Sequence, residues 1–309
     1  MLYLTYDNQA LADGAGAQLQ RIISIYLAAK FYKVGYIHQG LARMSYQGAK
    51  CLEDNTSDPR QMDDYNKAFT LPSTPLPTPF TKMFKIFDIS EEIIKQFRGA
   101  PENVLLVIQF AGTMIDKTPH LLLQQIPIPW TIRPTVIARP IVVAIHVRRG
   151  ELFVVDSDRM LPNSYYVECM RALHTLFTEV AVPYEFHLHT EVLTKPTLVT
   201  PEHHGICSRT KEAVLVTPED SHMEDFKEFG DCRFHINEYP IDTLKALTVA
   251  DVLLASRSSF SYVASILKQN GVVLFHPFWH SLSPSWIPTR EAKDILDAKE
   301  KILKILFKI

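Results

Sequence analysis

Apolar residues in the first third of the chain follow two rhythms, one typical of buried strands and one typical of amphipathic helices. Leu2–Tyr6 has the tyrosine and threonine content of a strand, and Val104–Ile108 is a continuous apolar run like those of strands covered on both faces. Between them, apolar residues at positions 19–27 recur at helical spacing, and residues 35–38 form another candidate strand. This strand–helix–strand opening predicts an α/β domain.

The second half of the chain repeats the α/β rhythm. The candidate strands are Ile141–Val147, 185–189, 213–216, Arg233–Ile236, 251–255 and 271–275, and helical patterns cover 164–177, 241–248 and Ser259–Leu267. Strands that alternate with helices predict a mostly parallel sheet. Residues 289–309 are amphipathic and rich in lysine, and we expect them to form a helix that packs back on the protein; the alternative is a helix on a membrane surface.

Two stretches interrupt the alternation of strands and helices. Residues 50–80 are polar and punctuated by proline, which predicts a long surface loop. Four prolines at positions 127, 129, 134 and 140 stiffen the chain and predict an interdomain linker. We therefore expect an N-terminal domain over 1–135, a C-terminal domain over 141–288, and a terminal helix over 289–309.

The composition narrows the possible partners. The 309 residues are 47% hydrophobic and 21% charged, with a formal net charge of −2, so we expect no nucleic-acid partner. The absence of an apolar run of about 18 residues predicts a soluble, cytoplasmic protein or a soluble domain excised from a larger protein. Four cysteines without a CxxC spacing favour reduced thiols, although Cys207 and Cys232 could pair. His203, His204 and Cys207 lack a fourth ligand at a sensible spacing, so no metal site is expected.

A histidine and two arginines stand at the end of a strongly apolar predicted strand. Ile141–Val147 contains His146 and runs directly into Arg148-Arg149-Gly150-Glu151. Ligands of open parallel sheets bind beyond the carboxyl ends of strands, and a guanidinium suits phosphate oxygens. Because alternate strand residues face opposite ways, His146 and Arg148 share one face, and Arg149 points to the other. We expect one arginine to bind an anion and the other to brace the site; the alternative is that both are tied to acidic side chains in a structural network.

A hydroxyl-rich turn follows the apolar strand predicted at 251–255. Ser258 or Ser259 is placed to cap the next helix, and Phe260 follows them. Uncovered N–H groups at the start of a helix attract anions. The turn predicts a second anion site, although ordinary serine capping also accounts for it.

A short glycine-containing loop, Asp13-Gly14-Ala15-Gly16, follows the first strand. Two glycines let the backbone turn sharply and approach a ligand. Because position 19 is leucine, the full GxGxxG dinucleotide fingerprint is not present.

In this order, the three segments resemble motifs of the GT-B fucosyltransferase superfamily, which includes α1,2-, α1,6- and protein O-fucosyltransferases. Residues 14–18 match a Gly-x-Gly-Asn-Gln-like loop, residues 146–151 match His-x-Arg-Arg-x-Asp, and residues 258–261 match a Ser-Ser-Phe-Ser-like segment. The chain departs from the motifs at Glu151, where the family has aspartate, and at Ala17, where it has asparagine. The resemblance covers the motifs and their spacing over most of the chain.

The resemblance implies an α/β, GT-B glycosyltransferase fold of two Rossmann-like domains whose parallel sheets face a cleft. The domain over 1–135 would lie on the acceptor side, and the domain over 141–288 would bind the nucleotide sugar. It implies an inverting enzyme that moves a sugar from a nucleotide diphosphate, with GDP-fucose favoured, to a hydroxyl of a glycan or glycoprotein acceptor. Arg148 would hold the diphosphate with help from Ser258 and Ser259, and His146 and Asp242 would contact the nucleoside. No metal or other cofactor is implied, because the arginine does the work of a cation.

Transfer to a hydroxyl also calls for a general base. Asp13 beside the glycine loop, Glu151 and Asp7 at the end of the first strand are candidates. Each of the three could instead be a helix cap, a turn residue or an ion-pair partner.

Three other functions compete with fucosyl transfer. The same fold could use UDP-xylose or another nucleotide sugar, since the base pocket is not readable from the sequence. The chain could bind a sugar or nucleotide without turnover. It could also be an interaction protein that docks on a membrane through its C-terminal helix.

Overall fold

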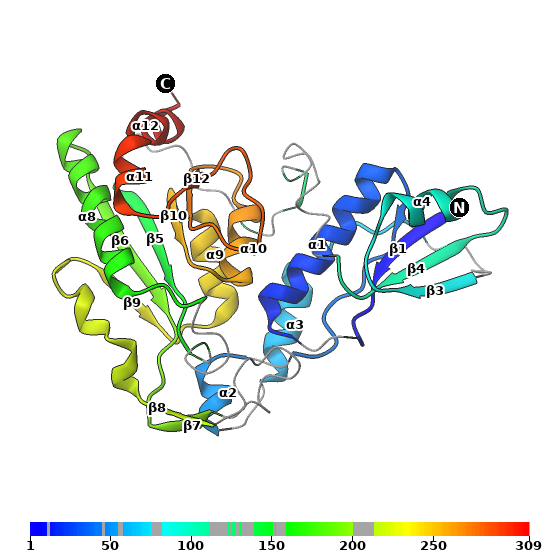
Figure 1. Ribbon diagram of the computed structural model, residues 1–309, viewed down its shortest axis with the longest axis horizontal. Coiled ribbons are helices and arrows are strands. Elements are labelled where there is room, and N and C mark those ends of the chain that lie inside the picture. The colour runs from blue at the N-terminus through cyan, green and yellow to red at the C-terminus, as the bar shows by residue number, and fades with distance from the viewer. Residues whose placement is uncertain are drawn as a thin grey trace. The chain divides into compact units, whose positions relative to one another are not determined.

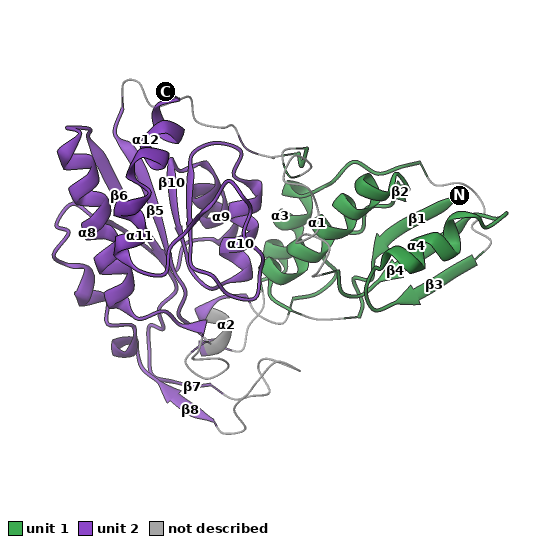
Figure 2. Ribbon diagram, turned by 45° about the horizontal axis from the view of Figure 1, so that its top comes forward, with its two compact units in different colours: residues 1–45, 58–129 green, residues 46–57, 130–309 purple. Residues whose placement is uncertain are grey.

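The computed structural model describes residues 1–10, 13–44, 47–54, 58–75, 82–111, 139–150, 159–199 and 213–308, with positions 123, 125–127, 130 and 152 besides. The chain divides into two compact units (Figure 2). Unit 1 consists of residues 1–45 and 58–129, and unit 2 consists of residues 46–57 and 130–309. Unit 2 therefore includes a short segment that lies far ahead of its main span in the sequence.

Unit 1 is built on a four-stranded parallel sheet with the strand order β2-β1-β4-β3. Its elements are β1 (Leu2–Tyr6), α1 (Ala15–Tyr32), β2 (Gly35–Tyr36), α3 (Pro59–Ala68), β3 (Lys82–Ile86), α4 (Glu91–Arg98) and β4 (Val104–Ile108). The central strands β1 and β4 are buried along their whole length, as their apolar runs predict. Ser90 caps α4, since its hydroxyl accepts a hydrogen bond from the amide of Ile93 at 3.3 Å.

The prediction of an unbroken loop over residues 50–80 is wrong. The segment contains α3, and it overlaps α2 (Ala49–Asp54) of unit 2. Asp58 caps α3 by accepting from the amide of Arg60 at 3.0 Å, and Pro59 occupies the first helical position, where its missing N–H costs nothing. The polar composition of this segment gave no sign of a helix. In the structure, α3 lies at the surface and buries Tyr65.

Unit 2 is built on a six-stranded sheet with the strand order β12-β11-β10-β5-β6-β9, in which all the neighbouring strands are parallel (Figure 1). These strands are β5 (Ile141–Val147), β6 (Tyr184–Thr190), β9 (Arg233–Ile236), β10 (Val252–Ala255), β11 (Val272–Phe275) and β12 (Ile287–Pro288). Numbered within the unit, the order is 3-2-1-4-5-6 read from β9, which is the order of a Rossmann fold. The predicted α/β class with parallel sheets is therefore confirmed, and two such α/β units are what a GT-B fold is made of.

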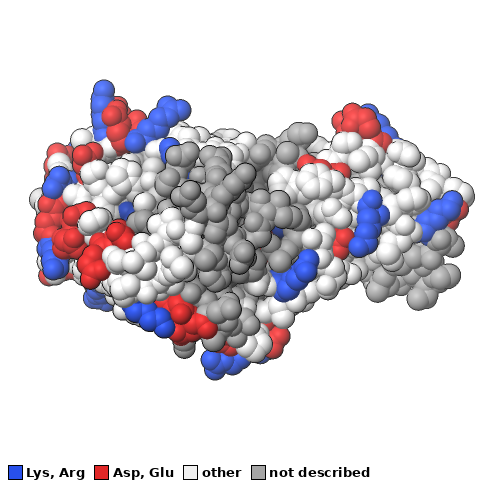
Figure 3. Space-filling model, turned by 60° about the horizontal axis from the view of Figure 1, so that its bottom comes forward, with Lys and Arg blue, Asp and Glu red and all other residues white. Residues whose placement is uncertain are grey.

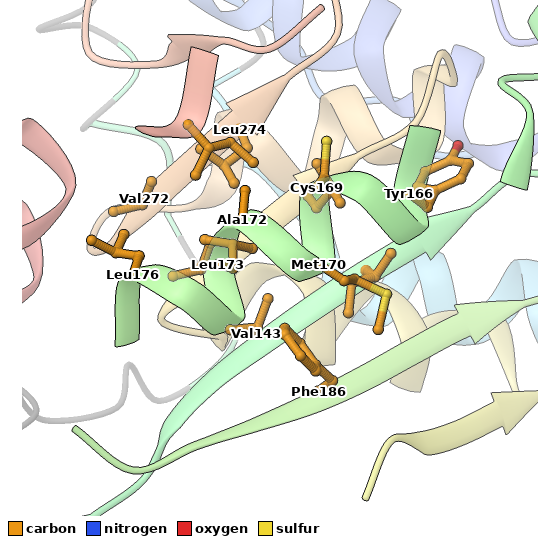
Figure 4. Close-up of a cluster of buried hydrophobic side chains, with 14 of the residues drawn as sticks. Val143, Tyr166, Cys169, Met170, Ala172, Leu173, Leu176, Phe186, Val272 and Leu274 are labelled. Carbon is orange, nitrogen blue, oxygen red and sulfur yellow. The ribbon is translucent and has the colours of Figure 1, made fainter. Parts of the chain in front are cut away.

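Helices cover both faces of the second sheet. On one face lie α8 (Asn163–Glu179), α11 (Ala292–Asp297) and α12 (Lys299–Phe307), and on the other lie α9 (Pro240–Val249) and α10 (Ser259–Leu267). The main core lies under α8, where Met170, Leu173 and Leu176 pack against Val143 and neighbouring strand residues (Figure 4). The terminal helices α11 and α12 add Ile295, Ile302 and Leu306 to this core.

A smaller element interrupts the second unit between β6 and β9. The strand expected at 213–216 is β8 (Val214–Val216), but it pairs antiparallel with β7 (Thr197–Val199) in a separate two-stranded sheet. Two 3-10 turns, η3 (Pro218–Ser221) and η4 (Met223–Phe226), then lead to β9. Alternation of apolar residues predicted the strand but could not assign its partner.

A buried carboxylate fixes the register of β10 on β5. Asp251 accepts from the amide of Val142 at 2.8 Å and from both terminal nitrogens of Arg139 at 2.6 and 2.8 Å. On the other side, the carbonyl of Asp251 accepts from Val272 at 2.8 Å. Gly271 permits this approach, because its φ is +90° and a Cβ would lie 2.2 Å from the Asp251 carbonyl oxygen.

Among the described helices, none has both the length and the apolar character needed to cross a bilayer.

Leu173→Ala should lower the free energy of unfolding by about 2–5 kcal/mol, because it leaves a cavity in the core under α8. Leu296→Ala is the matched control, since Leu296 lies on α11 with 45% of its surface exposed, and it should cost less than about 1 kcal/mol. Urea denaturation of both variants measures the difference. Equal losses would contradict the placement of the core.

Candidate functional site

The order in which the chain adds strands to the second sheet changes direction between β5 and β10. From β5 the chain proceeds outward to β6 and β9, and from β10 it proceeds outward on the opposite side to β11 and β12. Ligands of open parallel sheets bind beyond the carboxyl ends of the strands at such a point. The two anion-binding motifs of the sequence follow β5 and β10, so the fold brings them together here.

His146 connects the end of β5 to the start of α10. Its Nδ1 contacts the hydroxyl oxygens of Ser256, at 2.9 Å, and of Ser261, and its ring lies 5.5 Å from the ring of Phe260. Burial, with smaller effects of the charges of Arg148 and His189, lowers the pKa of His146 to about 3. The ring is therefore neutral at pH 7, so it positions the serine-rich turn by hydrogen bonding rather than attracting an anion by charge.

Arg148 lies on the same face of β5 as His146 and forms an ion pair. Its Nη1 donates to Glu191 Oε2 at 2.9 Å, and the Arg148 side chain keeps 12% of its surface exposed. Glu191 follows β6 and holds the guanidinium at the carboxyl edge of the sheet. Arg148 thus matches the alternative in which the arginine is tied to an acidic side chain, and its guanidinium lies at the edge where the sequence predicts an anion site.

Arg149 lies in a different environment, as strand alternation predicts. Its guanidinium donates to the side-chain oxygen of Asn163, the first residue of α8, and lies 5.9 Å from the ring of Tyr166. A second bond, at 2.8 Å, reaches the carbonyl of Arg148. Asn163 in turn donates to the carbonyls of Ser221 and His222 at 3.1 and 2.9 Å. Arg149 therefore braces the backbone around the motif from the α8 side.

Gly150 makes the turn that follows the arginines. Its φ of +67° lies in the left-handed region, which a residue with a side chain adopts at a cost. Glu151, a candidate base, lies outside the described residues.

The serines predicted after β10 occupy the start of α10. Ser258 is the N-cap of α10, and its hydroxyl accepts from the amide of Phe260 at 3.2 Å. The hydroxyl of Ser259 contacts Nε2 of His280 at 3.3 Å. The capping interpretation of Ser258 is therefore correct, and the helix start that it caps lies at the carboxyl edge beside the end of β5.

Asp242 lies in the first turn of α9, which follows β9 at the same edge of the sheet. Its side chain is exposed. α9 packs against α10 and β5, so the helix that carries Asp242 lies on the same face of the sheet as α10.

The glycine loop of unit 1 lies at the carboxyl end of β1, next to the end of β4. Gly14 is the N-cap of α1 with φ −65°, Gly16 lies within the first turn of this helix, and neither has a positive φ. The prediction that these glycines make a sharp turn is therefore wrong. Gly14 instead leaves the start of α1 without a capping side chain, and a Cβ there would meet nothing within 4 Å.

Both candidate bases of unit 1 form ion pairs. Asp13 pairs with Arg21 at 2.8 Å and accepts from the amide of Gly14 at 2.9 Å. Asp7 is buried at the end of β1 and pairs with Lys85 at 3.2 Å. Asp7 and Asp13 therefore match the alternative in which each carboxylate is an ion-pair partner.

Comparisons with known proteins identify no family for this chain. A scan against models of protein families finds no match, and a search of curated proteins finds none either. Among solved structures, the chain is similar to the bacterial iron-containing dodecameric glycosyltransferase TibC from enterotoxigenic E. coli H10407, with a TM-score of 0.32 and 9% identity. The match covers 91% of this chain but only 62% of TibC. A likeness this weak carries no argument about activity, so the function has to be argued from the site.

The partners of the site that sequence reasoning missed come from elsewhere in the chain. Glu191 lies 43 residues from Arg148, and Ser256 lies 110 residues from His146. Nothing in the local pattern singles out Glu191 from other surface acids. Gly150 alone carried a signal, because a glycine directly after a strand often supplies a positive φ.

The surface charge gives no further guide to a ligand. On the face shown in Figure 3, acidic and basic side chains of the described residues are interspersed.

Acid should destabilise unit 2 through its buried imidazoles. The pKa values of His146 and His280 fall to about 3 on folding, whereas unfolded histidine titrates near 6.5. The unfolded state therefore binds more protons between these values, and stability is lost as the pH falls below about 6.5, by about 2 kcal/mol for each ring at pH 5. Urea midpoints at pH 7.5, 6 and 5 measure the loss.

His280→Phe should make this pH dependence shallower, because phenylalanine keeps the stacking on Tyr262, at 4.1 Å, without a titrating nitrogen. His222→Asn, at an exposed histidine, should leave it unchanged. If His280→Phe unfolds as steeply with acid as the unchanged protein, this histidine does not contribute.

Proposed function

We propose that this protein is an inverting glycosyltransferase that moves a sugar from a nucleotide diphosphate donor to a hydroxyl of a glycan acceptor, with GDP-fucose as the favoured donor. The observation that carries the proposal is the meeting of Arg148 and the start of α10 at the switch point of a Rossmann-type sheet. A diphosphate needs concentrated donors and positive charge, and this edge offers both. Preference for fucose rests on the motif resemblance alone.

The leaving diphosphate is the group that the site is built to stabilise. As the bond between the anomeric carbon and the phosphate oxygen breaks, negative charge grows on the diphosphate, and the sugar passes through an oxocarbenium-like state. Arg148, held by Glu191, supplies the positive charge that a divalent cation supplies in other transferases. The first turn of α10 adds N–H donors, oriented by Ser258 and by the contacts of His146 with Ser256 and Ser261.

The acceptor hydroxyl attacks from the opposite face of the sugar and gives its proton to a base. Asp13 is our proposed base, with Glu151 as the second candidate. Asp13 lies beside the start of α1, where it pairs with Arg21.

A second candidate function is nucleotide-sugar binding without turnover. It is favoured by the ion pairs of Asp7 and Asp13, which occupy the two described carboxylates that were expected to accept the proton. Under this alternative the protein binds the donor as tightly but neither transfers nor hydrolyses the sugar.

A panel of nucleotides and nucleotide sugars tests the donor. GDP and GDP-fucose should raise the melting temperature more than UDP, UDP-xylose or other UDP-sugars at equal concentration, because a ligand that binds only the folded state stabilises it. Release of GDP from GDP-fucose, with and without glycan acceptors, then separates transfer from binding alone. A protein that none of these ligands stabilises is neither a transferase of this kind nor a donor-binding protein.

Arg148→Ala should lower the rate of transfer by roughly 100-fold or more, because it removes charge stabilisation from the leaving diphosphate. The matched control is Arg171→Ala, an exposed arginine of α8 that pairs with Glu228 at 2.7 Å, and it should retain full activity. Both variants should keep the far-ultraviolet circular dichroism of the unchanged protein. Equal turnover by Arg148→Ala and the unchanged protein would exclude the assigned role.

A further inference from the structure

A row of histidines crosses the second sheet at one level of its hydrogen-bond register. His146 of β5 pairs in register with His189 of β6, which pairs with His235 of β9. Glu238 follows β9, and ligand atoms of His189, His235 and Glu238 all lie within 4.8 Å of one another. These last three residues, here called the His–His–Glu group, take no part in the proposed sugar transfer.

His189 is a buried side chain whose two ring nitrogens have no hydrogen-bond partner. The residue is 1% exposed, and its Nδ1 lies 3.5 Å from Glu238 Oε2 without the geometry of a hydrogen bond. An unsatisfied buried polar group of this kind calls for a ligand.

A chain of side-chain contacts runs from Glu185 to the His–His–Glu group. Glu185 Oε2 lies 3.2 Å from His187 Nε2, His187 Nδ1 lies 3.0 Å from His235 Nε2, and His235 Nδ1 lies 2.7 Å from Glu238 Oε1. The ring of His235 is therefore held between His187 on one side and Glu238 on the other.

The turn that carries Glu238 is fixed to the end of β6. Asn237 has a φ of +55°, and its amide donates to the carbonyl of Thr190 at 3.0 Å. Its side chain accepts from the amide of Val192 at 2.9 Å and donates to the carbonyl of Val192 at 2.8 Å. Two ligands on neighbouring strands and a third on a clamped turn form a preorganised set.

We propose that His189, His235 and Glu238 bind one divalent transition-metal ion, with zinc favoured, and that water completes its coordination. Two imidazoles and a carboxylate suit such an ion. With metal–ligand bonds of about 2.0–2.2 Å, ligand atoms lie about 3.4 Å apart in a tetrahedral site. The rings of His189 and His235 stack with their centroids 4.4 Å apart and their planes 11° apart, so binding requires one imidazole to turn out of the stack.

His187 and Glu185 would orient His235 from behind, as hydrogen-bond partners of metal-bound imidazoles do. Glu238 is the most exposed ligand, so the ion can enter from its side. The proposal does not rest on the proposed sugar transfer, because the ligands come from β6, β9 and the turn after β9, whereas the diphosphate site is assigned to the ends of β5 and β10.

Titration of the full chain with Zn²⁺ and Co²⁺ after dialysis against a chelator tests the site. We expect one equivalent to bind, with visible Co²⁺ absorption bands and displacement of Co²⁺ by Zn²⁺, but no comparable binding of Mg²⁺. His235→Ala and Glu238→Gln should each weaken Zn²⁺ binding at least tenfold. Both residues are partly exposed, so these variants should fold, and metal-free melting curves check that they do.

The matched control is His222→Asn, which alters an exposed histidine 3.5 Å from Glu224 and should leave Zn²⁺ affinity unchanged. His187→Phe keeps a ring beside His235 but removes the hydrogen bond, and it should weaken binding by about tenfold. The proposal is overturned if no stoichiometric Zn²⁺ binds. It is equally overturned if binding survives His235→Ala and Glu238→Gln but is lost when His203 and His204 are both replaced by alanine.

Discussion

The register between β5 and β10 is the constraint on which the rest of unit 2 depends. Asp251 fixes this register near the amino ends of the two strands, through the amide of Val142 and the guanidinium of Arg139. Because the ladder repeats regularly along parallel strands, a register fixed at one end determines which residues meet at the other. At the carboxyl edge it sets His146 against Ser256 and Ser261. The geometry of the candidate site therefore depends on Asp251, which lies at the opposite end of these strands.

Arg148 and Arg149 show how two consecutive residues of the same type come to lie on opposite faces of a sheet. Arg148 forms its ion pair with Glu191 after β6, whereas Arg149 is buried with Asn163 and Tyr166 of α8. One guanidinium is thereby held at the edge of the sheet, and the other ties the backbone of the motif to the helix on the opposite face. The same residue type thus forms an ion pair at the edge of the sheet in one position and braces the backbone in the next.

The sequence predicted those features that depend on residues close together in the chain. The apolar runs gave β1, β4 and β5, and the serine after β10 gave the start of α10, because strand burial and helix capping are local effects. It failed for α3, whose polar surface hid its helical period, and for the pairing of β8. Glu191 and the His–His–Glu group were also beyond reach, since their members meet only through the pairing of β5, β6 and β9.

The histidine row bears on how the sheet reaches its correct pairing. On β6, Phe186 and Leu188 point into the core under α8, and His187 and His189 point to the other face. A slip of one residue would turn both histidines into apolar surroundings and expose the two apolar side chains. Misaligned intermediates of this strand should therefore be short-lived during folding. His187 and His189 thus also disfavour an incorrect register of β6.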